Sequence, residues 1–359
     1  LDADSEGEEG KFYVWKEEEL KSALSESEYN LTEVYYNIGK KALWEHSNNI
    51  LLRDKTDEQV AKKLDVPVDQ VQHAIKAINK KLLKVRTERI RPALDDKTLT
   101  SWNALMISGL TKAGQVFSEK KFLNAAIKNA NFIVSEQTTK EGNLLHSYKN
   151  GISKLDGFLE DYCFVIEAYT DLYQATFEQI WLERAKDLLD ISIENFYDTE
   201  RGMFYFTSKN ASGLIARKME LKDNVIPASN SSMAKSLNVL GHYFDKKAYL
   251  NMSETMLNNI QPYMSNYGSG YSNWGQLYLN QVFPYYEIAI VGDNAKEKLS
   301  ELNRTYVANK LLIGSQKSSE LPLLENKYVL GDTYIYVCVN KSCQLPVTEV
   351  SEAVKQLKE

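Results

Sequence analysis

The sequence is poor in the residues that mark metal, redox and membrane proteins. Its 359 residues include three cysteines and four histidines, and the histidines show no metal-ligand spacing. No apolar run approaches the roughly 20 residues that span a bilayer. A nucleophile elbow, a P-loop and a dinucleotide fingerprint are all missing. We therefore expect no metal, no cofactor and no membrane partner.

The chain also lacks a strong excess of charge of one sign. The formal net charge is −6, and the basic residues are interleaved with acidic ones. A nucleic-acid partner would require a basic patch or stripe, so none is expected. The chain has neither a signal peptide nor an initiating Met, which predicts that Leu1 lies inside a longer protein.

The sparse cysteines predict a reducing compartment and a cytoplasmic location. Cys163 lies on an apolar helix face and is expected in the core. Cys338 and Cys343 form a C-x4-C pattern at the end of an expected strand. They could close a disulfide or exchange with another thiol, and both are redox candidates. Their spacing differs from the C-x-x-C of redox helices, so inert thiols are the favoured interpretation.

Helical periodicity dominates what is present. Apolar side chains recur on one face of residues 99–114 and of residues 157–173. Further helices are predicted over 57–64, 68–86, 119–137, 178–196, 230–244 and 246–262. Between them lie short aromatic pieces that resemble strands, K-F-Y-V-W, L-L-H-S-Y, M-F-Y-F-T and G-Y-S-N-W.

Each of these aromatic pieces follows a glycine. The gaps between Gly10, Gly142, Gly202 and Gly270 are 132, 60 and 68 residues, so the first is about twice the others. A period near 65 residues accommodates two helices, a hairpin and loops, and repeats of that kind build arrays of helical hairpins. The sequence therefore predicts a mainly α protein, an α/α toroid.

The C-terminal part has a different character. E-I-A-I-V-G, K-L-L-I-G and Y-I-Y-V-C-V-N are typical of buried strands, and A-K-E-K-L-S-E-L-N-R and V-T-E-V-S-E-A-V-K-Q-L of helices. Strand–helix–strand order predicts a small α/β appendage. The expected domains are a toroid portion at 1–284 and this appendage at 285–359.

The opening stretch L-D-A-D-S-E-G-E-E-G has acidic residues at Asp2, Asp4 and Glu6, followed by Gly7. This matches the first half of an EF-hand loop, but position 12 is Tyr13 instead of the bidentate Glu. An acidic turn leading into a strand is the favoured interpretation, although it leaves the excess of acid unexplained.

Three polar clusters precede or open long helices, and 63 and 69 residues separate Lys97, Glu160 and Ser229. In a toroid every second helix points the same way, so the three helix starts are expected to meet at one end. Helix N-termini favour oxygen-rich ligands there. The clusters are Asp95, Asp96, Lys97, Trp102 and Asn103; Asp156, Glu160, Asp161 and Tyr162; and Asp223, Asn224, Ser229 and Asn230.

Helix capping alone explains some of these residues, because Asp, Ser and Asn are preferred N-caps. Beyond capping, Asp96 and Asp161 are the candidate general acid and base for a glycoside. Trp102 could stack on a sugar ring. Hydroxyl groups would be held by the remaining candidates, Asp95, Lys97, Asn103, Glu160, Tyr162, Asp223, Ser229 and Asn230. Each of the four histidines, His146 included, is expected to be structural.

Several long motifs resemble one family. D-A-D-S-E-G-E-E-G-K-F-Y-V-W, R-P-A-L-D-D-K-T-L-T-S-W-N-A-L-M-I, L-E-D-Y, D-N-V-I-P-A-S-N-S and Y-V-C-V-N-K-S-C-Q-L-P-V are similar to segments of the YyaL family. Its members are thioredoxin-domain-containing proteins related to the spermatogenesis-associated thioredoxin-like protein. The resemblance implies a six-hairpin toroid of the glycosidase and N-acylglucosamine 2-epimerase type. It also implies that the upstream thioredoxin-like domain and the first part of the ring are absent from this chain.

Two hypotheses follow. The first is a toroid that binds or acts on a carbohydrate at the helix starts. Hydrolase chemistry is favoured over epimerase chemistry, because the related epimerases rely on histidines and the three clusters contain none. The second is a non-enzymatic scaffold that presents clients to the thioredoxin-like domain, with Cys338 and Cys343 in thiol exchange. A structural toroid without chemistry is a further alternative.

Overall fold

The computed structural model describes residues 1–211 and 216–357. The chain divides into two compact units, Leu1–Asp96 and Lys97–Glu359. The sequence predicts a boundary at residue 284, which lies inside the second unit, just before its last sheet begins. Among the described helices, none combines the length and the apolar character needed to cross a membrane.

The first unit is a small helical bundle with a core of its own around Trp15, Leu20, Ile78 and Leu82. Helix α4 matches the predicted 68–86 within one residue, and α3 matches 57–64, where Thr56 and Gln59 form a capping box. Its elements are β1 (Asp4–Ser5), β2 (Glu8–Glu9), α1 (Glu17–Ala23), α2 (Glu26–Tyr36), η1 (Glu45–Ser47), α3 (Asp57–Leu64) and α4 (Val68–Thr87).

The opening stretch is the predicted turn. Strands β1 and β2 pair across Glu6 and Gly7, which both have positive φ. The predicted strand K-F-Y-V-W is not formed, apart from a single antiparallel bridge between Trp15 and Asn49. Its carbonyl oxygens at Phe12 and Val14 accept hydrogen bonds from the Arg89 guanidinium instead of from a neighbouring strand. The Arg89 guanidinium also stacks over the Trp15 ring, 4.1 Å from its centre.

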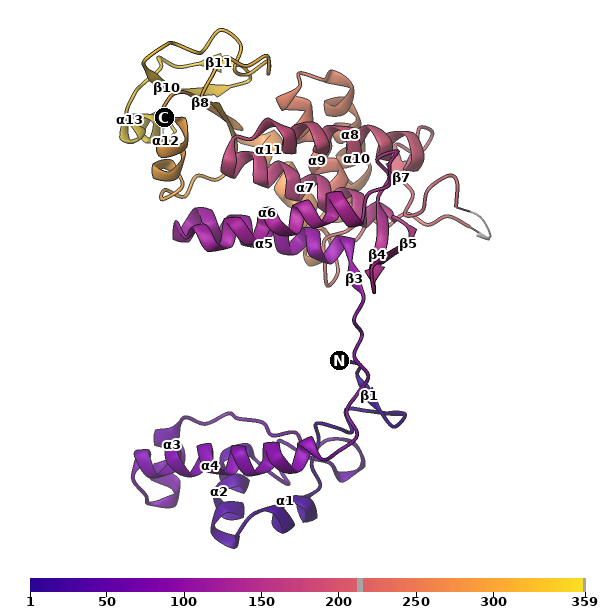
Figure 1. Ribbon diagram of the computed structural model, residues 1–359, viewed down its shortest axis with the longest axis vertical. Coiled ribbons are helices and arrows are strands. Elements are labelled where there is room, and N and C mark those ends of the chain that lie inside the picture. The colour runs from indigo at the N-terminus through magenta and orange to yellow at the C-terminus, as the bar shows by residue number, and fades with distance from the viewer. Residues whose placement is uncertain (212–215, 358–359) are drawn as a thin grey trace. The chain divides into compact units, whose positions relative to one another are not determined.

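The second unit is built from helical hairpins, as the α/α toroid class predicts. Helices α5, α7, α9 and α11 form an inner row, and α6, α8 and α10 each pack outside the preceding inner helix (Figure 1). The bounds are α5 (Thr100–Phe117), α6 (Lys120–Glu136), α7 (Leu159–Thr176), α8 (Gln179–Phe196), α9 (Ser229–Tyr243), α10 (Lys247–Met264) and α11 (Ser272–Val282). Helix α7 is the centre of the core, because 13 of its 18 residues are buried.

Short strands join the hairpins. A three-stranded sheet has the order β3-β4-β5, formed by Thr98–Leu99, Leu145–Lys149 and Ile152–Asp156, and a two-stranded one pairs β6 (Tyr197–Asp198) with β7 (Met203–Phe204). The predicted strand G-Y-S-N-W is wrong. Residues Gly268–Tyr271 form the 3-10 helix η2, and α11 follows. Tyr271, Trp274 and Leu277 are buried at a spacing of three residues, which makes each pair neighbours on a helix surface.

The α/β appendage has the predicted elements. Its sheet has the order β11-β10-β8-β9, with β8 and β9 parallel and the other pairs antiparallel. Alternate residues of β8 face the helical core and a second core under α12 and α13. The elements are β8 (Tyr286–Gly292), α12 (Ala295–Leu302), β9 (Lys310–Ser315), β10 (Thr333–Val339), β11 (Ser342–Cys343) and α13 (Val350–Gln356).

The cysteines divide as follows. Cys163 is a buried free thiol in the core, as predicted. Cys338 and Cys343 are joined by a disulfide, so the interpretation of these two as inert thiols is wrong. They lie directly opposite each other in the β10–β11 hairpin, a register that their sequence spacing alone does not reveal.

Candidate functional site

The structure brings the starts of the inner helices together. The Ser101 amide of α5 donates to Asp161 Oδ1 of α7 at 2.9 Å. The Leu159 amide of α7 donates to the Phe206 carbonyl just after β7, while Asn230 of α9 holds the Phe204 backbone. The α7 and α9 starts are therefore joined by the β6–β7 hairpin and its continuation.

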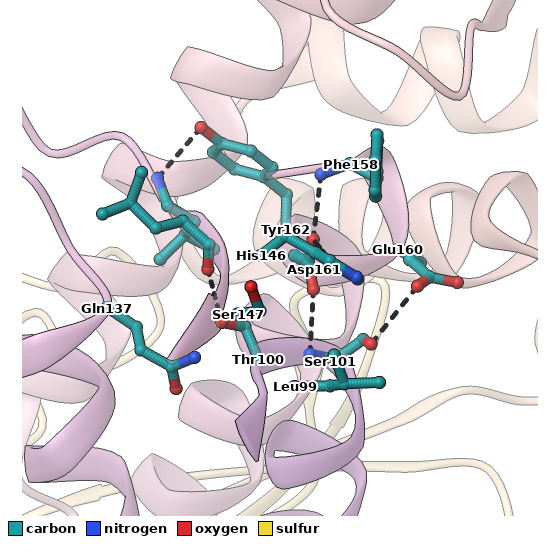
Figure 2. A network of polar contacts seen from close by, with 12 residues as sticks. Leu99, Thr100, Ser101, Gln137, His146, Ser147, Phe158, Glu160, Asp161 and Tyr162 are labelled. Carbon is teal, nitrogen blue, oxygen red and sulfur yellow. Dashed lines mark hydrogen bonds and ion pairs between the residues drawn. The ribbon is translucent and has the colours of Figure 1, made fainter. Parts of the chain in front are cut away.

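Asp161 is the centre of the α7 cluster (Figure 2). It is completely buried, and its Oδ2 accepts from the Phe158 amide and from His146 Nδ1, both at 2.9 Å. Together with the bond from Ser101, three N–H groups from α5, β4 and the α7 start meet this one carboxylate. Such a group is positioned to hold its neighbours, and no surface remains through which it could touch a substrate.

Glu160 and His146 lie next to Asp161, and both keep part of their surface exposed. Glu160 is half-buried, and its carboxylate accepts from Ser101 Oγ at 3.3 Å. Burial and the nearby charges of Asp161 and Glu220 raise the pKa of Glu160. The hydrogen bond to Asp161 raises the pKa of His146, whose side chain keeps 16% exposure. A raised pKa makes Glu160 a better proton donor near neutral pH, and His146 a better proton acceptor, than ordinary groups of their kind.

His146 is the functional candidate that the sequence analysis missed. Its place in a predicted strand, 14 residues before Glu160, favours a structural role. Strand β4 pairs with β3 at the α5 start, so it carries the imidazole to the cluster from outside the three motifs. The argument against histidine chemistry therefore does not hold for this site. The sequence offers only a weak signal for His146 as a site residue, namely a polar side chain within an alternating strand.

The same cluster offers ligand atoms for a cation. One atom each of His146, Glu160 and Asp161 lies within 4.8 Å of the others. However, both Asp161 oxygens already accept N–H groups, and the Nδ1 of His146 faces one of them. The donor set is thus better suited to an Asp–His pair with a neighbouring carboxyl than to an ion.

The α9 cluster is arranged mainly for capping. Asp223 accepts from the Ala228 amide, the Ser231 hydroxyl and the Asn273 amide of α11, so it ties two helix starts together. The Ser229 amide donates to Glu220, whose charge also acts on Glu160. The Ser229 hydroxyl is buried and has no hydrogen-bond partner among the described residues.

The remaining candidates are placed as follows. Trp102 is 62% exposed beside Ser101, on the first turn of α5. The Asn103 side-chain amide donates to the Leu99 carbonyl, one turn back in the chain. Lys97 begins the second unit and is exposed. Asp95 and Asp96 are exposed at the end of the first unit, so the pairing of Asp96 with Asp161 stays a prediction.

Tyr162 points away from Glu160, toward the β4 side of the helix (Figure 2). Its hydroxyl oxygen accepts the Leu144 amide at 3.0 Å. Gly157 makes this close approach possible, because a Cβ there would lie 2.8 Å from the Leu144 carbonyl and 3.1 Å from the Tyr162 ring. Tyr162 therefore belongs to different surroundings from the Glu160–His146 pair.

Comparison with known proteins agrees with the motifs. No family model matches the chain. It is 27% identical to human and 28% identical to mouse spermatogenesis-associated protein 20, over 99% of this chain and 51% of each relative. An uncharacterised Caenorhabditis elegans protein is 26% identical over 96% of the chain and 51% of its own length. The chain thus spans about half the length of these curated relatives.

Solved structures give weaker matches. A cellobiose 2-epimerase from Bacillus thermoamylovorans has a TM-score of 0.40 and 13% identity, covering 47% of this chain and 45% of its own. A GH76 α-mannanase from Bacteroides thetaiotaomicron has a TM-score of 0.43 and 12% identity, covering 65% and 67%. At these TM-scores neither match bears on function. The chain is thus homologous to spermatogenesis-associated protein 20, over about half of that protein's length.

Proposed function

We propose that the second unit acts on a carbohydrate by acid–base chemistry, with Glu160 and His146 as the proton-transferring pair. The observation that carries this is the contact of His146 Nδ1 with the buried Asp161 carboxylate, next to a half-buried Glu160. Asp161 fixes the imidazole with its proton on Nδ1, so that Nε2 is the basic nitrogen. Glu160, with its raised pKa, retains a proton more readily than an ordinary carboxyl group.

The roles then differ from the pair Asp96 and Asp161. Asp161 becomes a positioning residue, since three N–H groups enclose it. Glu160 donates a proton to a substrate oxygen, and His146 Nε2 accepts one from a hydroxyl group or a water molecule. Such a pair would serve hydrolysis of a glycoside or proton transfer next to a sugar carbonyl.

The carbohydrate class is supported by the surroundings of the pair. Trp102 exposes its ring one residue from Ser101, which contacts Glu160. Phe158 stacks on Phe206 with ring centres 5.1 Å apart, and His146 lies 4.8 Å from Phe158. Aromatic faces beside carboxyl groups match a ligand with apolar C–H faces and many hydroxyls.

The test is a substrate screen on the intact chain. Aldoses, ketoses and p-nitrophenyl glycosides would be incubated with the protein and followed by NMR, in parallel with Glu160→Gln and His146→Gln. Loss of one general acid or base lowers a rate by about 10²–10⁴-fold. The matched control is Glu254→Gln, which changes an exposed carboxyl group on α10. Turnover that survives both variants would contradict the proposal, and absence of turnover together with absence of sugar binding would favour the scaffold.

A further inference from the structure

A separate cavity of about 300 Å³ lies beside the α7 start, and neither Glu160 nor His146 lines it. Tyr162 and Phe196 contribute its aromatic side, with ring centres 5.2 Å apart. Its walls come from the turn before β4, the end of β5, the end of α8 and the loop after β7. The main polar residues of these walls are Thr139, Glu141, Asn143, Asp156, Asn195 and Ser208.

The Tyr162 hydroxyl group accepts a hydrogen bond, but it donates none to another described residue. The residue is 3% exposed, and its oxygen accepts the Leu144 amide. Among the described residues, no acceptor for its own hydroxyl hydrogen is found at hydrogen-bond distance. Buried tyrosine hydroxyls normally donate to a partner, because leaving a buried donor unpaired costs free energy. A ligand oxygen in the cavity would supply the missing acceptor.

The charges of the cavity select the kind of ligand. Glu141 and Asp156 are its ionisable acids, and no Lys, Arg or His is among the described residues that line it. Two carboxylates without a cation repel a phosphate or a carboxylate. Amides, hydroxyls and an aromatic floor instead match a neutral molecule that offers many donors and acceptors together with an apolar face.

We infer that this cavity binds a neutral sugar unit, with the Tyr162 hydroxyl donating to one of its oxygens. The inference takes its ligand class, carbohydrate, from the proposed function, but it uses none of the acid–base residues. The chain then has two carbohydrate contacts at the α7 start, one for chemistry and one for binding alone.

Binding of neutral sugars to the intact chain would be measured by saturation-transfer NMR and calorimetry, using glucose, mannose and N-acetylglucosamine. Glucuronate and glucose 6-phosphate are the anionic comparisons. Two variants address the cavity. Tyr162→Phe removes the hydroxyl, and Asn143→Phe fills the space from an exposed position whose side chain makes no hydrogen bond to another described residue. Asn124→Phe, exposed on α6 outside the cavity, is the matched control.

We expect a neutral sugar to bind, with about tenfold weaker affinity in Tyr162→Phe for the loss of one hydrogen bond. Asn143→Phe should remove the binding that Tyr162→Phe weakens, whereas Asn124→Phe should bind like the unaltered chain. Equal binding in Asn143→Phe, or preference for the anionic sugars, would overturn the inference. If Glu160→Gln alone loses binding, the sugar sits at the acid–base pair, so the cavity inference falls and the proposed function stands.

Discussion

The starts of α7 and α9 are built from the same repeat, yet their polar residues differ in what remains available. At α9, both carboxylate oxygens of Asp223 already accept hydrogen bonds, from the Ala228 amide, the Ser231 hydroxyl and the amide at the α11 start. At α7, the buried Asp161 plays that part, and Glu160 is left half-buried with a raised pKa. The comparison teaches that a carboxylate at a helix start is a cap by default. A catalytic role is indicated when a second carboxyl group lies beside a carboxylate whose oxygens already accept hydrogen bonds.

The largest expected effect comes from Asp161→Asn. The new amide places an NH₂ group or a single carbonyl oxygen where three N–H donors require acceptors. We expect a loss of about 3 kcal/mol in the free energy of unfolding. Urea denaturation at pH 7 measures it, with Asp156→Asn as the exposed control. A loss no greater than that of the control would show that Asp161 is not the centre of the cluster.

Asp223→Asn is expected to cost somewhat less, about 2 kcal/mol, because this half-buried carboxylate accepts two amides and one hydroxyl. The variant sharpens the comparison, since it should lower the melting temperature while leaving any turnover rate per folded molecule unchanged. Differential scanning calorimetry and the assay for turnover give the two quantities. A parallel loss of rate would place the α9 cluster in the catalytic machinery.

His146→Gln tests the pKa shift through stability. Because the folded-state pKa of His146 is raised, its bond to Asp161 stabilises fully below the unfolded pKa of about 6.5. That stabilisation is lost as pH rises through the folded pKa. The variant should therefore be less stable than the unaltered chain by about 1.5 kcal/mol near pH 5.5, with a smaller difference at pH 8.5. A difference independent of pH would contradict the charged pairing.

Glu160→Gln should have the smallest effect on stability, and of the opposite sign. The raised pKa means that folding disfavours the Glu160 carboxylate, so this group destabilises the fold above the unfolded pKa of about 4.3. We expect a slightly higher melting temperature for the variant at pH 7 and no difference near pH 3.5. A lower melting temperature at pH 7 would mean that Glu160 is a structural residue like Asp223.

The sequence predicted the helices well where one face was apolar and a cap was present. Helix α3, between the capping Thr56 and the left-handed Asp65, was found at its observed bounds. The error at G-Y-S-N-W has a physical reason. Aromatic residues favour strands in general, but here Trp274 is buried on a helix face and its indole N–H donates to the Leu221 carbonyl. A contact 53 residues away is not visible in a local pattern.

The sequence predicted the helix starts around which the candidate site lies, whereas the roles of its residues stay a prediction. The recurring spacing of Glu160 and Ser229 located the helix starts, because the repeat fixes which ends meet. The same reasoning could not tell the buried Asp161 from the accessible Glu160, since adjacent residues differ in burial only once α5 packs beside α7. His146 arrives by strand pairing, and pairing depends on register, which short strands specify weakly.

The exposure of Trp102 has a spectroscopic consequence. Trp15, Trp181 and Trp274 are buried and Trp44 is half-buried, whereas Trp102 exposes 62% of its surface at the α5 start. Its indole should dominate the red edge of the emission spectrum and should be the fluorophore most readily quenched by iodide. A molecule that settles beside Ser101 and Glu160 would shield that ring. Binding at this end of the inner helices can therefore be followed by light alone, without a label.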